Sequence, residues 1–101
     1  MSLKRYEEAI KDWQRYLSYQ PNDPDVTNTI GECYRMLGKN KEALGFINTA
    51  IQLNPNAAFF LNRAYTYKNL NNIENARNDA LTAKKAGIQL EASFAASLGI
   101  Q

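Results

Sequence analysis

The stretch IGECYRMLGKNKEALGFINTAIQLNP, residues 30–55, contains the clearest signal of how the chain folds. Its first part carries Ile30, Tyr34 and Leu37 at the three- and four-residue spacing of one helix face. Gly38 then suits a left-handed helix end, and a second apolar helical pattern runs on to Pro55, because proline cannot continue a helix. The stretch therefore predicts two consecutive helices joined by a tight turn.

The same pattern occurs on both sides of this stretch. Ala9 recurs as Ala43 and again as Ala76, and Pro21 recurs as Pro55, each time at a period of about 34 residues. Further matches keep this register: Tyr34 with Tyr67, Leu37 with Leu70, Gly31 with Ala64, and Tyr16 with Ala50 and Ala83. A fixed period in this range indicates that the chain stacks copies of one helical unit.

Apolar residues at helical spacing predict six helices along the chain. They cover residues 6–17, 26–37, 43–51, 60–70, 73–83 and 90–98. No segment alternates apolar and polar residues for long enough to predict a strand. The expected fold class is therefore all-α.

These residues resemble the tetratricopeptide repeat, a helix-turn-helix unit of about 34 residues. The resemblance is carried by Ile30-Gly31, Tyr34, Ala43, Ile47, Ala50 and Pro55 in one unit and by Phe60, Ala64, Tyr67, Ala76, Ala80 and Ala83 in the next. It implies a right-handed α-solenoid of antiparallel helix pairs, with about five repeat helices and a short capping helix. We expect residues 4–21 to be the second helix of a partial repeat, 24–55 and 57–87 to be full repeats, and 88–101 to cap the end. The chain would then be the C-terminal fragment of a longer protein of this family.

Three positions depart from the repeat pattern. Arg63 stands where the preceding unit has Ile30, and Thr27 stands where a large aromatic residue is usual. Ala80 replaces the larger Ile47 of the preceding unit. The last unit is therefore expected to be underpacked on that side, and Phe94 with Leu98 would fill the space.

The composition excludes several kinds of chemistry. The 101 residues include no histidine and a single cysteine, so the commonest general base and zinc ligand is missing and an intramolecular disulfide is impossible. The net charge of +2 is too small to favour nucleic acid. There is no signal peptide or membrane-spanning run, which leaves the compartment open, with the cytoplasm slightly favoured. We expect no enzyme activity, no cofactor, no metal and no membrane insertion.

The resemblance implies a role in protein–protein interaction, through a concave groove formed by the first helix of each unit. Its implied groove residues are Asn28, Glu32, Arg35, Asn62, Tyr65, Lys68 and Asn69. One subclass of the family binds acidic chaperone tails through a clamp of cations and asparagines, but only Asn62 matches that clamp and Glu32 would repel a carboxylate. The partner is expected to be a protein or peptide of unknown identity. A purely structural solenoid end without a ligand remains the alternative.

The first predicted helix raises the question of self-association. It corresponds to the second helix of a unit whose first helix is not in the sequence, so one apolar flank lacks its usual cover. Its candidate contact residues are Tyr6, Ile10, Trp13 and Leu17, which would pair two chains as a homodimer. Cys33 lies on the apolar stripe of the next helix and is expected to be a buried core residue.

Overall fold

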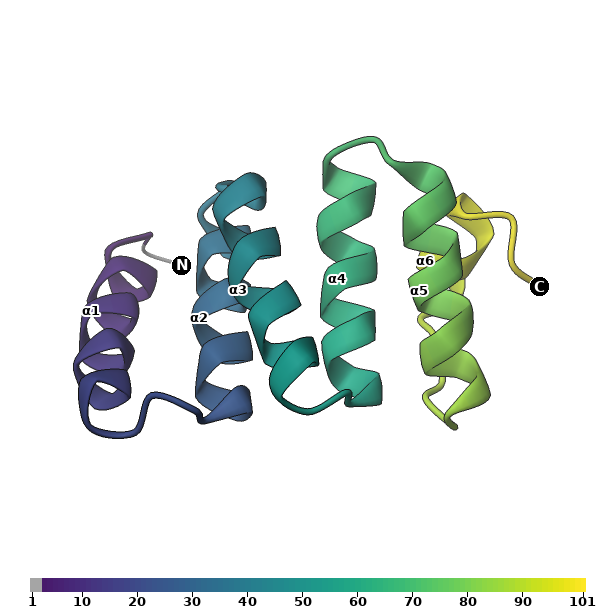
Figure 1. Cartoon of the computed structure of the whole chain (residues 1–101). Helices are drawn as coiled ribbons and strands as arrows, with labels where there is room; N and C mark the ends of the chain where they lie inside the picture. Colours follow the sequence, from purple (N-terminus) through teal and green to yellow (C-terminus); the bar gives the residue numbers. More distant parts are fainter. Residues whose placement is uncertain (1–2) are drawn as a thin grey trace.

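The computed structural model describes residues 3–101 and contains six helices in that range, with no strand among them (Figure 1). The helices are α1 (Leu3–Tyr19), α2 (Pro24–Met36), α3 (Asn40–Leu53), α4 (Ala57–Asn69), α5 (Ile73–Lys85) and α6 (Ala92–Ser97). They stack in chain order into a body of 42 × 29 × 20 Å, with α1 at one end and α5 and α6 at the other. The all-α prediction and the six helices are confirmed, although α3 begins earlier than expected and α6 is shorter.

The helix ends of the first complete unit follow from its sequence. Asp23 caps α2 by accepting a hydrogen bond from the Val26 amide at 3.1 Å, and Pro24 occupies the first turn, where no amide donor is needed. Gly38 follows two residues after the end of α2 at Met36 and has a φ of 78°. This conformation strains an L side chain, so glycine lets the chain reverse into α3.

The second unit makes the same reversal with a different residue. Asn71 has a φ of 62° and occupies the position in this unit that Gly38 occupies in the first. After both helices the chain closes with the same hydrogen bond, from the Lys39 amide to the Tyr34 carbonyl and from the Asn72 amide to the Tyr67 carbonyl, each at 2.9 Å. Asparagine tolerates the left-handed region better than other L residues, so the turn geometry is kept without glycine.

At Gly31 the backbone of α2 lies close to α3. A Cβ placed on it would lie 2.7 Å from Ile47 Cγ1 and 3.1 Å from the Ala43 carbonyl oxygen. The next unit has Ala64 at the equivalent position and Ala80 opposite it, and both are fully buried. The first unit thus pairs glycine with a large residue and the second pairs two alanines, and both combinations allow the helices to pack closely.

Arg63 replaces an apolar contact by an ionic one. In the first unit Ile30 is fully buried and Phe46 packs against its cluster. In the second unit, Arg63 donates from Nε and Nη2 to the two carboxylate oxygens of Asp79, at 2.7 and 2.9 Å, and from Nη1 to Asn48 Oδ1 at 3.0 Å. The arginine therefore ties α4 to both α5 and α3.

The carboxylate of Asp79 also affects the charge state of its partner. Its hydrogen bonds raise the pKa of the Arg63 guanidinium, although partial burial acts in the opposite direction. The rings of Phe60 and Tyr67 lie 5.2 and 5.7 Å from the guanidinium carbon. The cation is thus held by two aromatic faces as well as by its hydrogen bonds.

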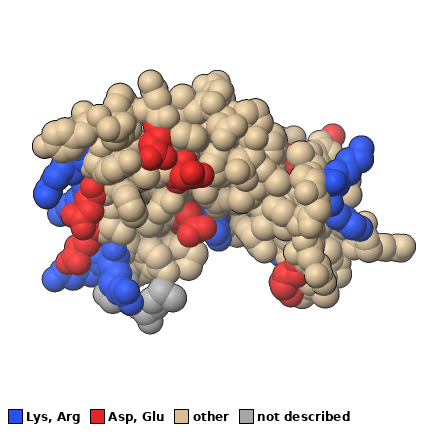
Figure 2. Space-filling view, turned by 90° about the horizontal axis from the view of Figure 1, so that it is seen from below, with Lys and Arg blue, Asp and Glu red and all other residues tan. Residues whose placement is uncertain are grey.

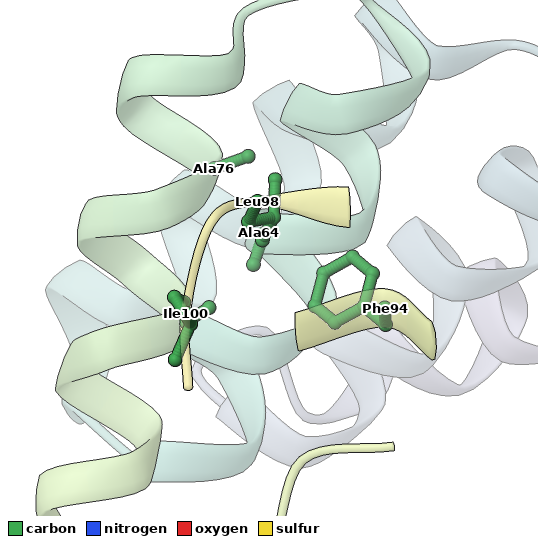
Figure 3. Packing of buried hydrophobic residues seen from close by; sticks show 6 residues of the cluster. Ala64, Ala76, Phe94, Leu98 and Ile100 are labelled. Carbon is green, nitrogen blue, oxygen red and sulfur yellow. The ribbon is translucent and has the colours of Figure 1, made fainter. Parts of the chain in front are cut away.

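The other two departures also have physical explanations. The buried Thr27 hydroxyl donates to the Asp23 carbonyl oxygen at 2.8 Å, so its polar atom is satisfied inside the helix. The small Ala80 is covered by residues from the C-terminal segment, as expected: Phe94, Leu98 and Ile100 pack with Ala64, Ala76 and Ala80 (Figure 3). Phe94 is only 4% exposed, so its ring lies within this cluster.

Candidate partner-binding groove

The candidate groove residues lie on corresponding faces of α2 and α4. Asn28, Glu32 and Arg35 follow one another at i, i+4 and i+7, and Leu61, Tyr65 and Lys68 repeat this spacing in the next unit. Residues at this spacing share one side of a helix. Figure 2 shows the outline hollowed between the two ends of the molecule, the region where α2 and α4 stand in Figure 1.

Three of the predicted residues form a hydrogen-bonded row across the two helices. Arg35 donates from Nε to Asn62 Oδ1 at 2.9 Å, and Asn62 donates from Nδ2 to Asn28 Oδ1, also at 2.9 Å. Asn62 is only 5% exposed. A buried amide with both ends bonded fixes the orientation of its partners, because breaking either bond would leave a polar group unsatisfied.

A second set of contacts continues the row toward the C-terminus. The Arg35 guanidinium carbon lies 5.2 Å from the Tyr65 ring centroid, and the Tyr65 and Phe94 rings lie 4.2 Å apart. Lys68 Nζ lies 5.5 Å from the Phe94 ring centroid. These contacts place Phe94 of α6 beside Tyr65 and Lys68, so the C-terminal segment borders the groove as well as covering the core.

The charges on this face are unequally accessible. Arg35 retains 18% of its side-chain exposure and Glu32 retains 56%, and their charged atoms come within 3.9 Å. The arginine is occupied by Asn62, Tyr65 and Glu32, whereas the glutamate is open to solvent. The α2 side of the face therefore presents an exposed carboxylate beside a largely shielded cation.

Two of the predicted groove residues behave differently from the expectation. Asn62 is a buried connector between Asn28 and Arg35 and not an amide open to a ligand. Asn69 donates from Nδ2 to Asn40 Oδ1 at 3.1 Å, so it joins the end of α4 to the start of α3 and lies outside the row. Both differences arise because long-range amide partners are invisible in a helical spacing pattern.

The candidate self-association residues on α1 are divided by the structure. Ile10 is buried in a cluster with Ile30 and Cys33, which corrects the expectation that it lies on an uncovered flank. Tyr6 and Leu17 are partly buried against the same cluster. Trp13 is 38% exposed, so of the four predicted residues it is the one that remains on the open side.

Cys33 is buried, as expected, and burial is the main reason why its thiol pKa is raised. The nearby charge of Glu32 adds to that increase. A raised pKa keeps the sulfur as a neutral thiol, which is the unreactive form.

Sequence reasoning missed the groove contact of Phe94, because apolar spacing predicts this residue only in the core. It also missed the partnership of Arg63 with Asp79, for which a signal existed. The two residues stand in the register of Ile30 and Phe46 in the preceding unit, so both members of one apolar pair are replaced together.

Residues 3–101 contain no cluster of acidic or cysteine side chains that could hold a metal ion. None of the helices described there is long and apolar enough to cross a lipid bilayer.

Comparison with known proteins gives one consistent result. Two family models, both described as tetratricopeptide repeat, match residues 1–64 and residues 57–86. No curated protein matches the chain. The family matches cover α1 through α5 and so include α2 and α4, the two helices that carry the row described above.

Proposed function

The chain belongs to the tetratricopeptide-repeat family, and we propose that it binds a protein partner on the α2–α4 face and performs no catalysis itself. Repeats of this family are generally protein–protein interaction modules and typically serve as scaffolds without enzymatic activity. The expected ligand is an extended peptide segment or a partner helix.

The observation that carries the proposal is the connected row of Asn28, Asn62, Arg35 and Tyr65. Its members come from two helices, and each is fixed by at least one contact with the next. A surface whose side chains are already ordered loses little conformational entropy when a partner binds. This rigidity distinguishes the row from an ordinary solvated helix face, where long side chains are free to move.

The row also offers specific binding chemistry. Asn28 accepts a hydrogen bond from Asn62 through Oδ1, while its Nδ2 group donates to none of the described residues. That amide can donate to a main-chain carbonyl of a peptide, and the Tyr65 ring offers an aromatic surface beside it. The exposed Glu32 carboxylate disfavours an acidic segment at the α2 end.

A random peptide library displayed on phage, selected against the immobilised chain, tests the proposal. Synthetic versions of the recovered peptides are then measured against Arg35→Ala and Tyr65→Ala, with Leu53→Ala as the control. Leu53 is 39% exposed on α3, which is outside the row. We expect each row variant to weaken binding at least tenfold and the control to leave it unchanged.

The folded state of each variant is checked by circular dichroism and by its urea midpoint. Recovery of peptides that bind all three variants equally would contradict the groove. Failure to recover any peptide above the background of a blocked surface would favour the alternative, in which this chain is a structural end of a solenoid.

A further inference from the structure

The end of the molecule formed by α1 concentrates exposed apolar side chains. Four of the eight large apolar side chains exposed within residues 3–101 lie on this one helix: Leu3, Trp13, Tyr16 and Tyr19. Three of the four are aromatic, and aromatic residues are enriched in protein interfaces. These side chains lie outside the α2–α4 face, so a partner bound there would not account for their exposure.

The repeat register explains why this flank is open. Trp13 and Tyr16 correspond to Ile47 and Ala50, which are 0% exposed on α3. Those two residues are covered inside the stack, where α3 packs between α2 and α4. The equivalent residues on α1 are 38% and 39% exposed because no helix precedes α1 in the described stack.

The opposite end of the molecule presents a complementary surface. Leu81 of α5 is 40% exposed and lines a hollow of about 450 Å³ together with Thr82, Lys84 and Lys85. A second hollow of about 300 Å³ shares Lys84 and is lined mainly by apolar residues of the C-terminal segment, including Ile88, Leu90 and Ile100. This end therefore combines concave apolar surface with two lysines at its rim.

The order of the helices makes the two ends compatible. In Figure 1, α1, α3 and α5 run in the same direction, and α6 lies behind α5, after the last helix of the last unit. A helix that continued the stack beyond α6 would run in the same direction as α1, α3 and α5, which are the second helices of their units (Figure 1). Chains related by translation along the stack would thus follow one another without a break in the alternation.

The charges agree with that arrangement. Figure 2 shows basic and acidic side chains at both ends of the molecule, so ion pairs can form between two copies placed end to end. The exposed side of α1 that carries Trp13 and Tyr16 is called the Trp13 flank here. Asp12 and Glu8 lie at helix positions beside it, and Arg5 lies about one turn before them. The acidic pair can meet Lys84 and Lys85 of another chain, which favours contact between unlike ends over contact between two α1 helices.

From these observations we propose that the chain associates with itself head to tail, the Trp13 flank of one copy docking on the Leu81 end of the next. Such a contact is heterologous: each copy uses two different surfaces and leaves one of each kind free. The contact therefore extends into a row of copies, whereas pairing of two identical α1 surfaces would stop at a dimer.

Light scattering of the intact chain from about 10 µM to about 1 mM provides the first test. The average mass is expected to rise above 11.4 kDa with concentration. Trp13 is the only tryptophan, so its emission should shift to shorter wavelength over the same range. A constant mass of one chain and an unshifted emission would overturn the proposal.

Two variants with opposite defects separate the arrangements. Trp13→Glu and Leu81→Glu each block one end, so each alone should remain at the mass of one chain. Their equimolar mixture should form a pair, because the intact α1 of the Leu81→Glu chain can dock on the intact end of the other. The tryptophan of the Leu81→Glu chain is the only one in that mixture, so its emission should shift on mixing.

The controls make each remaining outcome decisive. Leu53→Glu places the same charge on an exposed leucine away from both ends and should associate like the unchanged chain. Association of Leu81→Glu by itself, with none for Trp13→Glu, would show a symmetric α1 pair and overturn the head-to-tail contact. If circular dichroism shows that Trp13→Glu has lost helix, Tyr19→Glu replaces it, since that side chain is 77% exposed, and the mass of the mixture alone is then the measurement.

Discussion

Two glycine-to-alanine substitutions provide a stringent test of the packing between α2 and α3. Gly31 and Gly45 both lie inside helices, where replacing glycine by alanine is worth about 1 kcal/mol of helix propensity. A Cβ on Gly45 meets nothing within 4 Å. A Cβ on Gly31 lies 2.7 Å from Ile47 Cγ1, a distance at which something must move, and 3.1 Å from a backbone oxygen.

The expected magnitudes follow from this contrast. Gly45→Ala should raise the free energy of unfolding by about 1 kcal/mol, because only the propensity changes. At Gly31 the same gain is opposed by about 1–3 kcal/mol of overpacking, because the clash involves a β-branched side chain and main chain. Gly31→Ala should therefore be neutral or destabilising by up to about 2 kcal/mol, and the two variants should differ by about 1–3 kcal/mol.

Urea unfolding followed by far-ultraviolet circular dichroism measures the difference. The second unit already combines Ala64 with Ala80, so adding Ile47→Ala should remove the contact with Ile47 Cγ1, while the contact with the Ala43 carbonyl oxygen at 3.1 Å remains. In that background, which is itself less stable because of its cavity, Gly31→Ala should be more favourable than it is in the unchanged chain. Equal stabilisation by the two substitutions in the unchanged chain would refute the close approach at Gly31.

Three further predictions follow from burial and charge. Phe94→Ala should lower the free energy of unfolding by about 3–5 kcal/mol in urea titrations, since the ring is 4% exposed, and a loss below about 0.5 kcal/mol would contradict its role in covering the core. Arg63→Met should cost about 3–5 kcal/mol because Asp79 stays buried without its partner, whereas combining it with Asp79→Leu should cost less; a double variant at least as damaged as the single would count against this. The raised pKa of Cys33 means that the folded chain keeps the thiol proton to higher pH than the unfolded chain does. The stability advantage of the unchanged chain over Cys33→Ala should therefore shrink between about pH 8 and pH 10 in urea melts, and an advantage that grows would reverse the sign.

Local sequence signals were sufficient to predict most of the fold. The turn at Gly38 and the stop at Pro55 depend on the conformations that single residues allow, and the repeat register depends on which positions touch within a unit. The burial of Cys33 and Phe94 could also be predicted, because apolar spacing identifies the covered face of a helix.

The site was less predictable because its geometry depends on pairs of residues far apart in the sequence. Asn62 belongs to the face expected from its spacing, but its burial comes from the partners Asn28 and Arg35 on another helix. Asn69 has the same helical spacing as its neighbours and yet bonds to Asn40. Side-chain amides choose among several partners within reach, and a single sequence does not show which one lies closest.

The exchange of Ile30 and Phe46 for Arg63 and Asp79 means that adjacent units of this stack respond differently to their surroundings. Apolar burial weakens on cooling and strengthens in the presence of excluded salts such as sulfate. A partly buried ion pair loses part of its attraction to screening and carries a desolvation cost that falls as temperature rises. Sulfate should therefore strengthen mainly the contact of α2 with α3, while added chloride salt acts mainly on the ion pair between α4 and α5. The weakest boundary of the stack is thus set by the solvent conditions.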